Sequence, residues 1–131
     1  MKNNAKIITL LATVIVSAFA GCRTPVAIEP MTGKQQTAIY QAGYFYAKLD
    51  VDSDTVFRTA IRAIDQMGIL RTGEIHGNDY VTIHGRQIGD KKILVRIRPI
   101  SSDQSEVRVR VGTIGNLPES QMIYAKIRDA L

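Results

Sequence analysis

Residues 92–112 read KILVRIRPISSDQSEVRVRVG, and this stretch decides the fold. Apolar and polar side chains alternate over residues 92–99 and again over residues 106–112, which is the period-2 pattern of half-buried strands. Residues 101–103, Ser-Ser-Asp, separate the two runs by a turn of hairpin length. Because so short a connection requires antiparallel pairing, the sequence predicts a hairpin with one apolar face and one charged face.

The charged face of this hairpin is rich in arginine. Antiparallel pairing brings its four guanidinium groups into one patch, and the planar guanidinium suits phosphate and carboxylate groups. One interpretation is therefore an anion-binding surface. The other, which we favour at this stage, is a solvated sheet face on which charge prevents aggregation and Glu106 neutralises part of the patch. The candidate residues are Arg96, Arg98, Arg108 and Arg110.

Neighbouring segments carry similar patterns. Residues 40–51 alternate apolar and polar side chains, which predicts one strand. Residues 52–68 place apolar side chains at three- and four-residue spacing, which predicts an amphipathic helix. Residues 70–76 and 80–87 predict two further strands, the first of them weak because Gly73 interrupts it.

A second amphipathic helix is expected at the end of the chain. Asn116 is a favourable N-cap, Glu119 occupies the capping-box position, and an apolar stripe continues to Leu131. The predicted order is β-α-β-β-β-β-α. The fold class is therefore α+β, an antiparallel sheet of four to five strands with two helices on one face, in a single domain over residues 39–131.

The first 21 residues have the three parts of a secretory signal peptide. Lys2 and Lys6 precede an apolar run over residues 7–20, and small residues then lead to Cys22. The alternative is a transmembrane helix, but about 20 apolar residues are needed to cross a bilayer and this run is shorter. We therefore assign residues 1–21 to a signal peptide.

The sequence FAGC at residues 19–22 resembles a bacterial lipobox, with Phe19 in place of the usual Leu or Val. The resemblance implies signal cleavage between Gly21 and Cys22, followed by S-diacylglycerol and N-acyl (palmitate) modification of the cysteine. In Gram-negative lipoproteins an Asp after the cysteine is the familiar signal for inner-membrane retention, and here Arg23 follows. The resemblance thus implies an outer-membrane protein on the periplasmic side.

Residues 22–38 contain Pro25, Pro30 and Gly33 and have no sustained periodicity. We therefore expect a lipidated cysteine followed by a flexible tether that connects the lipid to the folded domain.

Composition excludes several classes of function. The chain has 131 residues with 17 basic and 12 acidic side chains, and its net charge of +5 falls to +3 once Lys2 and Lys6 leave with the signal peptide. This excess is too small for the basic surface of a nucleic-acid binder. The single cysteine excludes an internal disulfide and any multi-cysteine metal site.

The residue pattern predicts neither catalysis nor a metal site. His76 and His84 are the only histidines, and they flank a tight turn at positions too far apart to share a metal. Asp50, Asp52 and Asp54 lack the glycine and the distal glutamate of a calcium loop. We therefore expect no enzymatic activity, no catalytic residues, no metal and no cofactor.

Three segments carry a family resemblance. They are Tyr-Gln-Ala-Gly at residues 40–43, Met-Gly at residues 67–68 where the predicted helix closes, and VRVRVGTIG at residues 107–115. With these motifs, residues 22–131 resemble a family of small bacterial lipoproteins known only as a domain of unknown function. The resemblance implies the fold and the location, and it brings no catalytic or ligand-binding residues.

Together these observations predict a lipid-anchored protein of the bacterial cell envelope that acts as a non-enzymatic binding or scaffolding module. The alternative is a protein that binds an anionic envelope component through its basic sheet face. The expected partners are the membrane, reached through the lipid anchor, and another envelope protein or an anionic envelope component, but not nucleic acid.

Overall fold

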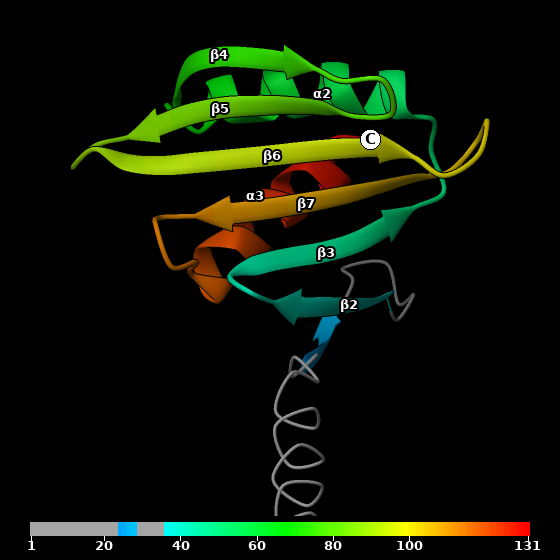
Figure 1. Cartoon of the computed structure of the whole chain (residues 1–131), viewed down its shortest axis with the longest axis horizontal. Helices are drawn as coiled ribbons and strands as arrows, with labels where there is room; N and C mark the ends of the chain where they lie inside the picture. The colour runs from blue at the N-terminus through cyan, green and yellow to red at the C-terminus, as the bar shows by residue number, and fades with distance from the viewer. Residues whose placement is uncertain (1–23, 29–35) are drawn as a thin grey trace, which may run out of the picture.

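The computed structural model describes residues 24–28 and 36–131 (Figure 1). Within this part of the chain, one sheet of seven strands lies against two helices. The elements are β1 (Thr24–Ile28), β2 (Gln36–Gln41), β3 (Tyr44–Leu49), α2 (Ser53–Gln66), β4 (Leu70–His76), β5 (Val81–Gln87), β6 (Lys91–Pro99), β7 (Ser105–Val111) and α3 (Leu117–Asp129). None of the described helices is long and apolar enough to span a bilayer.

The strand order is β1-β2-β3-β7-β6-β5-β4, and every neighbouring pair is antiparallel. Both helices cover the same face, with α2 behind the β4–β6 side and α3 behind β7 and β3 (Figure 1). The α+β class and the placement of both helices on one face are confirmed. The predicted strand number of four to five is too low, because β2–β7 already supply six strands and β1 adds another at the edge.

The core lies between the sheet and the helices. Phe45, Val109, Val95 and Ile83 form one row across four strands, and each is at most 1% exposed. From α3, Tyr124 packs its ring against that of Phe45, with the ring centroids 5.1 Å apart. The alternation read from residues 92–112 thus places every second side chain in this core and the arginines on the opposite face.

The single strand predicted over residues 40–51 is in fact part of a hairpin. Ala42 and Gly43, with φ of 50° and 78°, form a tight turn between β2 and β3. A Cβ atom at Gly43 would overlap the Ile114 carbonyl oxygen. The β2–β3 turn and the loop after β7 therefore approach so closely that only a residue without a side chain fits at position 43. The sequence prediction missed the turn because the alternating pattern continues through it.

Residues 24–28, which the sequence assigned to a flexible tether over residues 22–38, form the edge strand β1. This strand pairs with β2 and places Thr24 opposite Tyr40. Main-chain hydrogen bonds to an open sheet edge hold such a strand without an alternating pattern, and an edge position also tolerates Pro25. The sheet therefore begins before the predicted domain boundary at residue 39. Residues 1–21 and Cys22 lie outside the described residues.

Asp52 caps the N-terminus of α2, because its Oδ1 accepts a hydrogen bond from the Thr55 amide at 2.9 Å. This hydrogen bond lowers the pKa of Asp52 below its usual value of 3.8. A group with a lowered pKa stabilises the fold above its unfolded-state pKa, and this stabilisation is lost as pH falls through the folded-state pKa.

We therefore expect Asp52→Ala to lower the melting temperature at neutral pH, whereas Asp52→Asn retains a capping oxygen and loses less. The difference between wild type and Asp52→Asn should shrink as pH falls below 3.8. Thermal melts of the three proteins across acidic pH measure this. A constant difference between wild type and Asp52→Asn down to strongly acidic pH would contradict the assignment.

Candidate functional site

The outer face of the sheet, opposite the helices, holds the arginines predicted from the sequence. Arg96 of β6 lies directly opposite Arg108 of β7. Arg98 lies opposite Glu106, and Arg110 lies opposite Leu94, in the flanking rows. The four residues thus lie on one face of two neighbouring strands, and two of them, Arg96 and Arg108, are like charges directly opposite each other.

The Arg96–Arg108 pair is held by a symmetrical set of contacts. Arg96 stacks on the Tyr80 ring, with its Cζ 4.6 Å from the centroid, and its Nε donates to Thr82 Oγ1 at 3.0 Å. Arg108 stacks on the Tyr46 ring at 4.7 Å, and its Nε donates to Glu106 Oε1 at 2.6 Å. Within the described residues, no group accepts a hydrogen bond from the terminal nitrogens of either guanidinium.

These contacts determine what the pair can do chemically. Stacking and the Nε hydrogen bond fix the plane of each guanidinium, so less conformational entropy is lost when the terminal nitrogens bind a ligand. Two opposed cations that are both fixed favour an anion between them over a neutral group. The Glu106 carboxylate neutralises part of this charge, as the sequence suggested.

The other two arginines are engaged differently. Arg98 forms an ion pair with Asp79 of the β4–β5 turn, with NH2 and Oδ2 2.8 Å apart. Arg110 stacks on Tyr44 at 5.0 Å and donates to the Thr113 carbonyl oxygen. Among the predicted site residues, Arg96 and Arg108 are therefore the best suited to an external anion.

A shallow hollow of about 340 Å³ lies beside Arg108 on the outer face. It is lined by Ile39, Gln41, Tyr46, Glu106 and Arg108. Ile39 and the Tyr46 ring supply its apolar surface, Gln41 supplies an amide, and Glu106 and Arg108 of β7 supply its charges.

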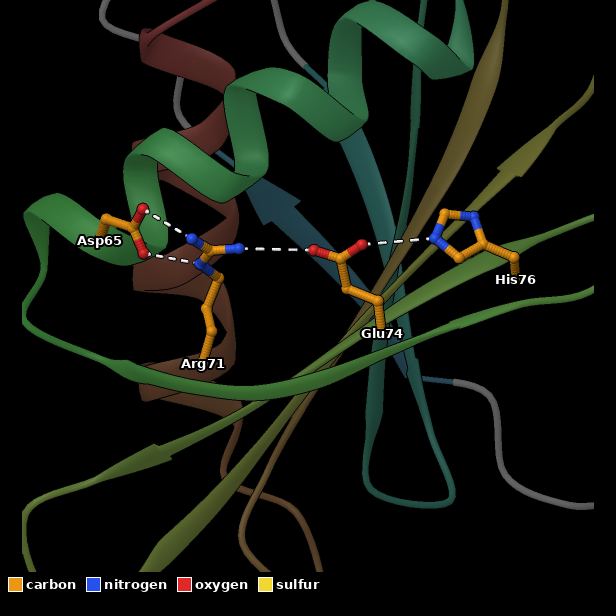
Figure 2. Close-up of polar contacts among 4 residues, drawn as sticks. All are labelled: Asp65, Arg71, Glu74 and His76. Atoms are coloured by element: carbon orange, nitrogen blue, oxygen red, sulfur yellow. Dashed lines mark hydrogen bonds and ion pairs between the residues drawn. The ribbon is translucent and has the colours of Figure 1, made fainter.

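A second polar cluster lies on the helix side of β4, and the sequence analysis did not find it (Figure 2). Arg71 bonds Asp65 of α2 through Nε and NH2, at 2.8 and 3.3 Å. Arg71 also contacts Glu74 at 3.4 Å, and Glu74 contacts His76 Nε2 at 3.3 Å. The hydrogen bond to Asp65, with the charge of that carboxylate, raises the pKa of Arg71.

This cluster connects the edge strand β4 to the end of α2 through polar contacts instead of apolar ones. His76 also contacts the Phe57 ring edge-on, with centroids 5.8 Å apart. Because the members of the cluster pair with one another at the surface, we assign it a structural role. The only signal in the sequence was the polar character of Arg71, Glu74 and His76, which occupy the inward positions of a strand that the sequence predicted only weakly.

The histidines and aspartates singled out from the sequence separate in the structure. His76 lies on the helix side of the sheet, whereas His84 lies on the outer face opposite Leu94, so the two imidazoles cannot bind one metal ion. Asp52 caps α2, and Asp50 accepts from Gln104 at 2.8 Å. Within the described residues, no three metal-ligating side chains come together. Gly21 and Cys22, the predicted cleavage and lipidation residues, lie outside this part of the chain.

The family was resolved by comparison with known proteins. A family profile described as "Protein of unknown function (DUF3568)" matches residues 4–130. The chain belongs to this family. The predicted membership of a family of unknown function is thereby confirmed.

No curated protein matches the chain. Among solved structures, the crystal structure of CalU16 from Micromonospora echinospora is similar at a TM-score of 0.41 and 13% identity, covering 84% of this chain and 80% of that protein.

Proposed function

We propose that this member of the DUF3568 family is a lipid-anchored protein of the bacterial cell envelope that acts as a non-enzymatic binding or scaffolding module. The signal peptide over residues 1–21 and the lipobox ending at Cys22 support the anchor. Arg23 after the cysteine supports the periplasmic side of the outer membrane as its location. Its partners are the membrane, through the lipid, and a second component of the envelope.

The geometry favours an anionic group as the ligand of this module. The observation that carries the proposal is the cross-strand pair Arg96–Arg108, in which each guanidinium is stacked on a tyrosine and tied down through Nε. Like charges directly opposite each other destabilise a sheet, so a pair built with this much support is better explained by a bound anion than by solubility alone. The ligand class is phosphate or carboxylate groups of the envelope or of a partner protein.

The test uses small soluble anions, because these reach the outer face without involving a membrane. The chain from residue 23 onward retains every strand and helix that the structure describes. We expect pyrophosphate or citrate to shift the Arg96 and Arg108 side-chain NMR signals. Arg96→Gln with Arg108→Gln should weaken binding at least about tenfold, since one charge-assisted hydrogen bond contributes about 1.5–3 kcal/mol. Binding should also weaken as added salt shortens the screening length.

The matched control is Arg58→Gln with Arg62→Gln, which removes the same charge from the exposed side of α2. We expect this control to bind as wild type does, and both double variants to melt within a few degrees of it, since exposed charges contribute little to stability. Equal binding by the two double variants would show that only net charge matters and would contradict the proposed site.

A further inference from the structure

Three connections meet at one end of the sheet, on the left of Figure 1. They are the β2–β3 turn, the β5–β6 turn and the β7–α3 loop, and we call this the anchor end. The Gly112 amide donates to the Lys92 carbonyl oxygen at 2.8 Å, which joins the β7–α3 loop to the start of β6, next to the β5–β6 turn. Close contact between the backbones of Gly43 and Gly115 brings the β2–β3 turn against the β7–α3 loop. β1 also begins at this end, because Thr24 pairs with Tyr40 near the end of β2.

The most exposed large apolar side chains of the described residues all lie at the anchor end. Ile88 in the β5–β6 turn is 98% exposed, Ile114 in the β7–α3 loop is 87% exposed, and Leu70 at the start of β4 is 70% exposed. The next most exposed, Ile75, reaches 51% and lies further along β4. Nothing in the fold requires isoleucine at the tip of a turn, and three exposed apolar side chains at one end of the sheet are suited to contact with an apolar layer.

The charges around these side chains have the sign that an anionic lipid surface attracts. Arg86 and Lys92 lie opposite each other beside Leu70, on the outer face. Lys91 adds a third cation, although Glu119 pairs with it at 2.6 Å and Asp90 pairs with Arg86.

The loops at the opposite end of the sheet are acidic instead. Asp50 and Asp52 lie before α2, Asp103 lies in the β6–β7 turn, and Asp79 lies in the β4–β5 turn, where Arg98 pairs with it. An anionic membrane would repel this end of the domain and attract the anchor end.

The length of chain before β1 identifies the occupant of this surface. Cys22 precedes Thr24 by two residues, which span at most about 7 Å when extended. If Cys22 is lipidated, the start of β1 is held at the membrane surface. We propose that the anchor end docks onto anionic lipid, with Ile88 and Ile114 inserted at the boundary between headgroups and acyl chains. The proposal rests on lipid anchoring at Cys22, and it gives the domain a fixed orientation at the membrane.

The test uses the full-length lipidated protein in vesicles of phosphatidylethanolamine with phosphatidylglycerol. Ile88→Cys and Ile114→Cys are each labelled with an environment-sensitive fluorophore. Both should show blue-shifted emission and lose at least about half of it when lipids carry a quencher just below the headgroups. The matched control is Ile100→Cys in the β6–β7 turn, a 46% exposed isoleucine at the opposite end. It should show neither change.

Two outcomes would overturn the proposal, and they are distinguishable. Vesicle flotation with no difference in quenching among positions 88, 114 and 100 would leave the anchor in place and refute the docked orientation. Failure to float, with the fluorophore reacting at Cys22 of the wild type, would refute lipid anchoring itself and the orientation with it. The wild type is informative because Cys22 is the only cysteine in the sequence.

Discussion

Cys22→Ser is expected to abolish lipid attachment and to leave an unprocessed precursor in Gram-negative cells. The diacylglycerol is transferred to a thiol, and a hydroxyl does not form the thioether that the lipobox peptidase requires. Without acyl chains the protein lacks its lipid anchor, in which each buried methylene contributes about 0.8 kcal/mol, and only the apolar run of the uncleaved signal peptide can hold the precursor at a membrane. Metabolic labelling with palmitate and the apparent mass on a gel report the two effects.

Arg23→Asp is the matched control for this change. It alters the neighbouring residue and leaves the thiol in place, so palmitate incorporation and cleavage should match wild type. By the resemblance to other lipoproteins, the product should move from the outer to the inner membrane. A Cys22→Ser protein that is cleaved and sediments with membranes like wild type would refute the anchor.

The parts of the fold that the sequence predicted are those in which the period of the apolar residues matches the face of the strand or helix that is buried. Val95 and Val109 alternate with Arg96 and Arg108, and the sheet is buried on one face only, so period and burial agree. The same holds for α2, whose apolar stripe faces the sheet. The N-cap of α3 could be predicted, because Asn116 acts on an amide within its own first turn, and in the same way Asp52 caps α2.

The parts that the sequence did not predict depend on partners far away in the chain. β1 is held by main-chain bonds to β2, and such bonds leave no side-chain pattern to read. The inward face of β4 carries Arg71, Glu74 and His76 in place of apolar residues, and this edge strand is joined to α2 through the pairing of Arg71 with Asp65.

The candidate site also has one part that the sequence predicts and one part that it does not. That four arginines share a face follows from alternation and a short turn, so it could be predicted. The sequence could not predict which of the four are held in place. The tyrosines that stack on Arg96 and Arg108 come from the β4–β5 connection and from β3, which are distant from them in the chain. Strand order across the whole sheet, with β3 beside β7, decides those contacts.

Gly115→Ala is expected to destabilise the domain by about 2–5 kcal/mol and to displace the loop that carries Ile114. Gly115 has φ of 94°, a conformation that costs a residue with a side chain about 1–2 kcal/mol. A Cβ atom here would also overlap the Gly43 backbone and lie 2.7 Å from the Tyr40 hydroxyl oxygen. Because backbone cannot move aside as a flexible side chain does, this overlap adds about 1–3 kcal/mol.

Gly112→Ala separates the two contributions. Gly112 has a similar φ of 76° in the same loop, but a Cβ atom there would meet nothing within 4 Å. It should therefore lose only the conformational part, about 1–2 kcal/mol by urea denaturation. Equal losses for the two variants would mean that the contact between Gly43 and Gly115 contributes nothing. A larger loss at Gly115 would mean that this backbone contact holds the two loops of the anchor end together, and a docked orientation at the membrane requires such rigidity.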